Sequence, residues 1–340
     1  GITVARWLSR ALYRVRLGYV NEQALQDMDK DATVVFVMNH RSNMDYVIVT
    51  FLAASRSALS YAVGEWARVW PLSPIIRAMG AYFIRRKSRG RLYRQVLARY
   101  VQMATRGGVS QAVFPEGGLS LDGRMAPPRV GLLNYIIDDF DPEAREVIFV
   151  PVALNYDRVL EDTFLVAADQ SGTRRFRPPM MHLLRRVGLH IWLRLTRRFR
   201  RFGTASVSFG DPLELSKFRD TTTGDLTTAV AAELKHRIMQ AIPVLGVPLV
   251  AHALTYDGVT DKAALVAVLE AKLGALKPKR MPLPRRPAGE IMSDALDRLG
   301  GRGCIAVDGD TIQITEAGRA ILAYYANSIT HHFDANLAEH

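Results

Sequence analysis

The chain alternates between short apolar runs and longer segments with helical periodicity. Apolar runs predict strands at 33–38, 59–63, 81–86, 109–114, 147–156 and 205–210. Between them, apolar residues recur at helical spacing near 44–54, 65–79, 90–106, 129–139, 180–200 and 224–241. This alternation is typical of parallel strands covered by helices. We therefore predict an α/β fold with a mostly parallel central sheet flanked by helices.

The two ends of the chain have different patterns. Residues 2–17 predict a basic amphipathic helix, with Arg6, Arg10 and Arg14 on one stripe. The proline-bearing basic stretch 276–289 predicts a linker, followed by a helix, a hairpin turned at 308–310 and a second helix, an order that resembles a winged-helix unit. The predicted division is an N-terminal helical region (1–30), an α/β domain (31–245) and a C-terminal linker with a small α+β unit (246–340).

Composition narrows the class of protein. With 340 residues, 49% of them hydrophobic, the chain can bury a full core, and its net charge of +12 favours anionic partners. The apolar run 241–254 contains two prolines and is shorter than the roughly 18 residues of a spanning helix, so no transmembrane helix is expected. Arginines interrupt the opening residues, so no signal peptide is expected either. The single Cys304 excludes an intramolecular disulfide and a cysteine-based zinc site and fits a reducing compartment.

The stretch "HRSNMD" contains His40 and Asp45, between a predicted strand and a predicted helix. Ser42 and Asp45 have the spacing of a capping box with aspartate in place of glutamate, so His40 would lie in the turn before the helix. In such a turn the carboxylate can reach an imidazole nitrogen, which fixes the tautomer and raises the basicity of the other nitrogen. The alternative is that Asp45 only caps the helix and His40 is a polar turn residue.

Three more predicted strands end in residues suited to ligand binding. "FIRR" ends in Arg85 and Arg86, whose guanidinium groups suit a phosphate. "FPEGGLS" carries Glu116 before two glycines, and "VPVALNYDRVLED" carries polar residues after its apolar run. Ligands bind at the carboxyl ends of strands in open α/β sheets, so these segments are candidates for one site.

Taken in order, these four segments resemble the motifs of the glycerolipid acyltransferase superfamily: His-x4-Asp, G-x-x-F-I-R-R, F-x-E-G and V-P-V. "HRSNMDY", "FIRR" and "VPVALNYDRVLE" are most similar to the glycerol-3-phosphate and dihydroxyacetone-phosphate acyltransferases. The resemblance implies that His40 is the general base and that Asp45 orients it. It also implies further substrate-binding residues, namely Arg85, Arg86, Glu116, Gly117, Gly118, Ser120, Arg124, Arg129 and Pro151, with Pro151 on the acyl-donor side.

One position departs from the family pattern. Leu119 stands where the third motif commonly has an arginine that contributes to phosphate binding, and a leucine cannot bind a phosphate. Arg124 and Arg129 would have to supply the positive charge. The departure leaves the identity of the acceptor open.

The expected activity is transfer of a fatty acyl chain from acyl-CoA or acyl carrier protein to the sn-1 hydroxyl of glycerol 3-phosphate, giving lysophosphatidic acid. No metal and no cofactor other than these substrates is expected. One alternative acceptor is a lysophospholipid (1-acylglycerol 3-phosphate) or another glycerolipid. An alternative of another class is a non-catalytic scaffold that binds membranes or nucleic acid.

Basic segments outside the motifs predict contact with a membrane. Residues 174–201 contain ten arginines and no acidic residue, interleaved with large apolar side chains. With the first helix and the run 241–254, this pattern predicts an interfacial surface, and hence a peripheral or monotopic protein at the cytoplasmic face of a membrane. Nucleic-acid binding is not expected, because a helix that tracks phosphates does not need those apolar residues. The histidine pairs His182/His190 and His331/His332 are predicted to be surface residues rather than metal ligands.

Overall fold

The computed structural model describes residues 13–45, 60–64, 81–84, 90–172, 202–279 and 281–334, with only the backbone of 60–64 and 81–84. The strands that it contains are β1 (Arg14–Tyr19), β2 (Thr33–Met38), β3 (Ser60–Gly64), β4 (Ala81–Ile84), β5 (Gln111–Val113), β6 (Val147–Tyr156), β7 (Thr204–Phe209), β8 (Leu213–Glu214), β9 (Ile305–Asp308) and β10 (Thr311–Ile314).

The first eight strands form one sheet in the order β1-β7-β6-β2-β5-β3-β4, with β8 also paired to β6. β2 pairs in parallel with β5 and β6, and β3 pairs in parallel with β4 and β5. β7 and β8 run antiparallel to β6. This arrangement confirms the predicted mostly parallel sheet in an α/β fold.

All ten residues of strand β6 are buried. Its continuous apolar run is what a strand covered on both faces requires. Pro151 lies in its middle, where the partner on one side changes from β8 to β7. The Pro151 carbonyl faces that side and accepts a hydrogen bond from the Gly210 amide (2.9 Å). Proline has no N–H to donate, but at this position no neighbouring strand needs one, because the pairing with β8 has ended and that with β7 has not begun.

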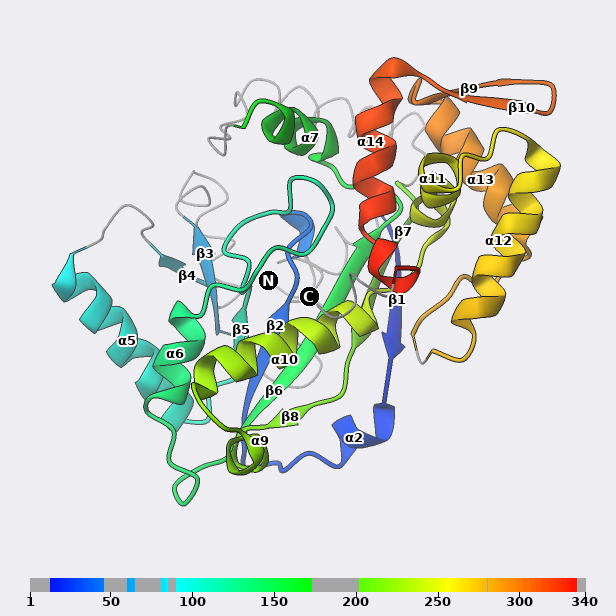
Figure 1. Ribbon diagram of the computed structural model, residues 1–340. Helices are drawn as coiled ribbons and strands as arrows, with labels where there is room; N and C mark the ends of the chain where they lie inside the picture. The colour runs from blue at the N-terminus through cyan, green and yellow to red at the C-terminus, as the bar shows by residue number, and fades with distance from the viewer. Residues whose placement is uncertain are drawn as a thin grey trace, which may run out of the picture.

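Some helices pack on the sheet, and others gather beside its β1–β7 end (Figure 1). They are α2 (Glu22–Gln26), α5 (Arg91–Arg106), α6 (Gly131–Ile137), α7 (Asp162–Gln170), α9 (Leu215–Thr221), α10 (Leu226–Ala241), α11 (Gly246–Tyr256), α12 (Lys262–Leu276), α13 (Ala288–Gly300), α14 (Glu316–Asn327) and the short 3₁₀ helix η2 (Thr330–His332). α10 packs on β6 and α6, while α12, α13 and α14 surround α11. The predicted helix, hairpin and second helix of the C-terminal unit correspond to α13, β9–β10 and α14.

Three sequence predictions are wrong. Arg14–Leu17 belong to strand β1 rather than to an N-terminal helix, because alternation of Arg14, Val15, Arg16 and Leu17 also suits a strand, and β7 offers an open edge. Residues 1–12 lie outside the described residues. The apolar run 241–254 does not form a membrane-facing surface, since every residue from Val247 to Leu254 is buried inside α11.

The third wrong prediction is that the C-terminal histidine pair lies at the surface. His332 is buried, and its Nε2–H donates to the Ile242 carbonyl at the end of α10 (2.9 Å). His331 makes the corresponding bond to the Met239 carbonyl (2.8 Å). His182 and His190 lie outside the described residues. Among the residues described, no single helix meets the length and hydropathy of a membrane span, and α10 and α11 meet them only as a pair bent by 95°.

Candidate active site

The turn after β2 brings His40 and Asp45 into contact. The His40 Nδ1–H donates to Asp45 Oδ2 over 2.9 Å, and both side chains are buried. The His40 ring also packs on Phe114, with 4.3 Å between the ring centroids. Holding the proton on Nδ1 leaves Nε2 as the basic nitrogen, which is the tautomer needed to take a proton from an alcohol.

Asp45 also shapes the turn itself. Its Oδ2 accepts hydrogen bonds from the backbone N–H groups of Arg41 (2.7 Å) and Ser42 (3.0 Å), and the Ser42 hydroxyl accepts one from the Met44 N–H (3.1 Å). The bond from the Ser42 N–H to Asp45 is one half of a capping box, while the Ser42 hydroxyl accepts from the second N–H after it rather than the third. Asp45 is therefore both the predicted cap and the partner of the imidazole, so the two interpretations of the motif are not alternatives.

Tyr156, the last residue of β6, completes the surroundings of the Asp45 carboxylate. Its hydroxyl donates to Asp45 Oδ1, on the side away from His40. Burial, and after it the charge of Asp45, raises the pKa of Tyr156 well above its usual value. The tyrosine therefore stays protonated and acts as a permanent donor. Sequence reasoning gave Tyr156 no role, because its contact spans 111 positions of the chain.

Glu116 holds the backbone of His40. Its Oε1 accepts from the His40 N–H (2.8 Å) and its Oε2 from the Ala126 N–H (2.9 Å). Burial raises the pKa of Glu116, and its two backbone hydrogen bonds act against that rise. The Ser120 N–H donates to the His40 carbonyl (3.0 Å), and the Ser120 hydroxyl bonds within its own turn, to the Arg124 carbonyl (2.6 Å). The predicted third motif thus braces the turn that carries His40.

Side chains also connect the same turn to two other parts of the chain. Glu161 accepts from the Ser42 hydroxyl (2.8 Å) and from the side-chain amide of Asn43 (2.9 Å), and burial raises its pKa. Arg41 is buried and donates to the Gly123 carbonyl. Neither contact has a local sequence signal, since the partners are distant along the chain. The result is a turn whose His40 and Asp45 are held in place by contacts from several parts of the chain.

The remaining predicted substrate residues are spread around this core. Gly117 has φ +66°, so a side chain there would be strained, and it would meet the Arg129 side chain at 2.9 Å. Gly118 has open space around it, and the Arg124 side chain is half exposed beside Asp122. Leu119 is partly buried and packs against the core.

Other predicted residues are not joined to this cluster. Pro151 lies within β6 and pairs with Val37 of β2. Arg85 and Arg86 lie outside the described residues. Their binding roles, like the catalytic roles of His40 and Asp45, stay predictions.

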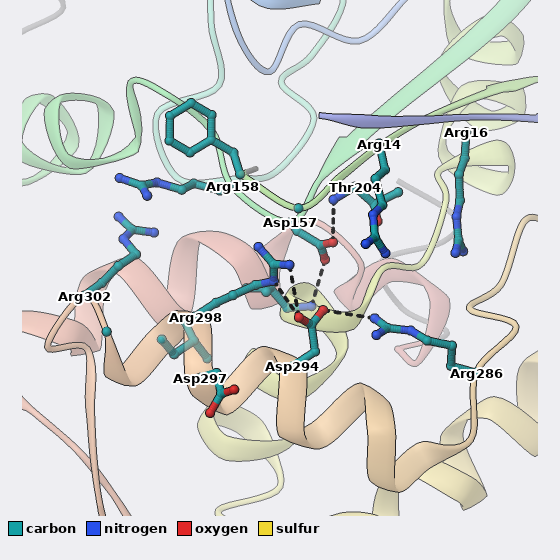
Figure 2. A pocket seen from close by; sticks show the side chains of 15 residues that line it. Arg14, Arg16, Asp157, Arg158, Thr204, Arg286, Asp294, Asp297, Arg298 and Arg302 are labelled. Atoms are coloured by element: carbon teal, nitrogen blue, oxygen red, sulfur yellow. Dashed lines mark hydrogen bonds and ion pairs between the residues drawn. The ribbon is translucent and has the colours of Figure 1, made fainter. Parts of the chain in front are cut away.

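A separate cavity of about 520 Å³ lies between β1, the end of β6 and α13 (Figure 2). Neither His40 nor Asp45 lines it. Within the described part of the chain, no three histidine, cysteine, aspartate or glutamate side chains gather as metal ligands.

Comparison with known families identifies the class to which this fold and turn belong. Residues 19–155 match the acyltransferase family model, and residues 191–335 match the glycerol-3-phosphate acyltransferase C-terminal region. The chain therefore contains an acyltransferase domain followed by a glycerol-3-phosphate acyltransferase C-terminal region. Together the two matches take in the His40–Asp45 turn, all of β6 but its last residue, and the C-terminal helices.

Among individual proteins, the chain is similar to bacterial proteins named glycerol-3-phosphate acyltransferase. It is 28% identical to those of Pseudomonas aeruginosa (strain UCBPP-PA14) and Aeromonas hydrophila over 360 aligned positions, which cover 97% and 96% of this chain and 42% of each relative. The Pseudoalteromonas atlantica protein is 27% identical over 88% of this chain and 39% of its own length. The chain thus spans about two-fifths of the length of the curated relatives that it matches.

A solved structure also matches, that of the 1-acyl-sn-glycerophosphate (LPA) acyltransferase PlsC from Thermotoga maritima. Its TM-score is 0.41 at 17% identity, over 66% of this chain and 71% of that one.

Proposed function

We propose that the protein transfers a fatty acyl chain from a thioester, acyl-CoA or acyl carrier protein, to the sn-1 hydroxyl of glycerol 3-phosphate. The observation that carries the proposal is the His40–Asp45 pair, in contact at 2.9 Å in the turn after β2. The names of the full-length relatives support glycerol 3-phosphate as the acceptor.

The proposed reaction is a direct transfer. His40 Nε2 takes the proton of the acceptor hydroxyl as its oxygen attacks the thioester carbonyl carbon, and the C–S bond then breaks. The proton on Nε2 passes to the departing sulfur, so the products are an ester and a thiol and the enzyme is regenerated. Asp45 stabilises the imidazolium that forms in between, because its carboxylate already accepts the Nδ1–H.

Leu119 bears on the acceptor rather than on the chemistry. It packs against the core at the place where the family motif commonly has a phosphate-binding arginine. A phosphate near the third motif would have to be bound by Arg129 or Arg124 instead. The alternative acceptor is a lysophospholipid or another glycerolipid.

The reaction is tested by thiol release from palmitoyl-CoA in detergent, with and without glycerol 3-phosphate. Release should require the acceptor and should fall at least about a hundredfold in His40→Ala, since general-base catalysis contributes about 10²–10⁴-fold. His236→Ala, an exposed histidine on α10, is the matched control and should retain full activity.

Two other results would change the proposed function. If only a lysophospholipid supports His40-dependent release, the acyltransferase assignment stands and the acceptor assignment fails. If neither acceptor supports release from palmitoyl-CoA or palmitoyl carrier protein, the catalytic proposal is wrong and a non-catalytic scaffold is favoured.

We also propose that the protein docks peripherally on an anionic membrane surface, such as the cytoplasmic face of a bilayer, through α5. Four large apolar side chains, Leu92, Val96, Tyr100 and Met103, are exposed on this helix. Their spacing of four, four and three residues places them on one stripe. The helix has four arginines and no acidic residue, which complements an anionic lipid surface. The basic segments 1–12 and 174–201 lie outside the described residues.

Sedimentation with vesicles tests the docking face. Leu92→Glu and Met103→Glu should each reduce binding to phosphatidylglycerol vesicles severalfold, because a charge would have to enter the acyl boundary. Val307→Glu, on the exposed face of the β9–β10 hairpin, is the matched control and should bind like the wild type. Equal binding by all three variants would exclude α5 as the docking face.

A further inference from the structure

The cavity between β1, the end of β6 and α13 has an unusual concentration of arginine (Figure 2). At about 520 Å³ it has the size of a small-ligand site, since such sites are about 300–1,000 Å³. Six arginines line it: Arg14, Arg16, Arg158, Arg286, Arg298 and Arg302. Three aspartates also line it: Asp157, Asp294 and Asp297.

The positive charge exceeds what the neighbouring carboxylates neutralise. Arg286 and Arg298 share Asp294, each at 3.0 Å. Arg302 is paired with Asp162 at 2.6 Å. The Asp157 carboxylate accepts instead from the backbone N–H groups of Thr204 (2.8 Å) and Val247 (3.0 Å).

Within the described ranges, the other three arginines, Arg14, Arg16 and Arg158, form no ion pair, and Asp297 points away from them (Figure 2). The charge of Asp162, which already pairs with Arg302, also acts on Arg158. Burial, and after it the nearby charge of Arg302, lowers the pKa of Arg158. Several guanidinium groups at one cavity give it a positive potential that attracts an anion.

The cavity is separated from His40 by a row of buried aromatic rings. Tyr156, whose hydroxyl bonds Asp45, packs edge to face on Tyr13 with 5.5 Å between the ring centroids. Tyr13 packs in turn on Phe202 at 5.8 Å, and Phe202 lines the cavity beneath the Arg158 guanidinium. A ligand in the cavity would therefore contact the far side of this row rather than His40.

We propose that this cavity is a phosphate-binding site separate from the His40–Asp45 pair. Arg14, Arg16 and Arg158 would donate to the phosphate oxygens, because a guanidinium fork matches phosphate geometry and stays charged. The phosphate belongs either to a phospholipid headgroup or to a soluble phosphorylated compound. The proposal does not depend on the acyl-transfer reaction.

Calorimetric titration of the full chain with pyrophosphate, at fixed ionic strength, tests the soluble source. Arg14→Gln/Arg16→Gln should weaken binding about tenfold or more, because charge-assisted hydrogen bonds are lost. Arg158→Gln changes a different element and should also weaken binding. Lys277→Gln/Arg319→Gln removes the same charge from exposed positions on α12 and α14 and should leave binding unchanged.

Vesicle binding tests the lipid source with the same variants. Binding to phosphatidic acid vesicles that depends on Arg14, Arg16 and Arg158, in the absence of pyrophosphate binding, would identify a headgroup as the ligand. His40→Ala should bind like the wild type in both assays, so failure of the catalytic proposal would not affect this result. If the cavity variants and the exposed control lose binding equally, or no phosphate binds, the proposal is wrong.

Discussion

At the scale of single residues, Asp45 both shapes the turn and orients the His40 imidazole. Oδ2 accepts from the imidazole and from two backbone N–H groups of the turn, while Oδ1 accepts from the Tyr156 hydroxyl. The folding of the turn and the orientation of the base therefore depend on the same side chain. Its substitution must be chosen to separate the two.

Asp45→Asn makes that separation. The amide oxygen can still accept from the turn, while the amide NH₂ can donate to the Tyr156 oxygen, so the turn should stay folded. The charge that stabilises the imidazolium is lost, and we expect kcat to fall roughly 10²–10⁴-fold. The measurement is kcat beside the urea midpoint. A matched loss of stability, with unfolded protein explaining the lost activity, would contradict the proposed orienting role.

What the sequence predicts at this scale follows from distance along the chain. His40 and Asp45 are five residues apart and belong to a local capping pattern, so their contact could be predicted. Tyr156 and Glu161 reach the same turn across more than a hundred residues, and only tertiary packing brings them there. Glu116 was expected at the acceptor pocket but bonds two backbone amides, since nothing local distinguishes a brace from a ligand contact.

At the scale of elements, Gly123 joins the loop after β5 to α14. It has φ +89°, and a β-carbon there would lie 1.9 Å from the Tyr324 carbonyl oxygen. Gly123→Ala should therefore lower the free energy of unfolding by about 3 kcal/mol or more, from strain plus displacement of α14.

Gly172→Ala is the control for Gly123→Ala. Gly172 also has a positive φ, +64°, but open space around it, so alanine should cost only about 1 kcal/mol. Both values come from urea unfolding. Equal losses would show that the contact with α14 contributes nothing.

The bond between η2 and α10 makes stability depend on pH. Burial lowers the pKa of His332 to about 4, from the 6.5 expected in the unfolded chain. Between those values the unfolded chain binds more protons, so stability should fall as pH drops from 6.5 and level off below 4. The loss is at most about 3 kcal/mol.

His332→Gln isolates this contribution from that of the buried carboxylates. Its free energy of unfolding, compared with that of the wild type at pH 7.5 and pH 4.5, should decline less on acidification. His236→Gln, at an exposed position of α10, should decline as the wild type does. If His332→Gln also follows the wild type, His332 is not the group responsible.

The elements could be predicted where one periodicity dominated. The runs at 33–38 and 147–156 coincide with β2 and β6, because continuous apolar residues suit a strand buried on both faces. β1 was missed because its residues fit both helical and strand alternation, and the partner that decides, β7, lies some 190 positions away. Membrane contact was expected of α11 from its hydropathy alone, which cannot distinguish lipid from a protein interior.

At the scale of the whole molecule, the C-terminal helices are tied to the sheet through buried hydrogen bonds. The Tyr325 hydroxyl donates to Asp162 (2.6 Å) and accepts from the Val159 N–H just after β6 (2.9 Å). The Ser328 hydroxyl accepts from the Asn155 side chain on β6 (3.3 Å). These contacts join the predicted α/β domain to the predicted C-terminal unit, whose boundaries at residues 30 and 245 stay predictions.

Tyr325→Phe should therefore destabilise the molecule as one unit. Removing the hydroxyl leaves a buried N–H without its acceptor, at a cost of about 1–3 kcal/mol. Circular dichroism and fluorescence should still report one coincident transition. Tyr256→Phe removes a hydroxyl from a half-exposed tyrosine and should cost less. Two resolved transitions in Tyr325→Phe would instead mean that the C-terminal helices unfold independently.

The four hydrogen bonds to Asp45 have one more consequence, which concerns where a proton can go. A carboxylate has about four acceptor sites, and four donors already surround this one. Three of these donors meet Oδ2 and one meets Oδ1, so the carboxylate is anchored at both of its oxygens. Under the proposed mechanism the carboxylate stabilises the imidazolium without itself taking up the proton, so the transfer from an alcohol would end at His40 as a one-proton event rather than a relay.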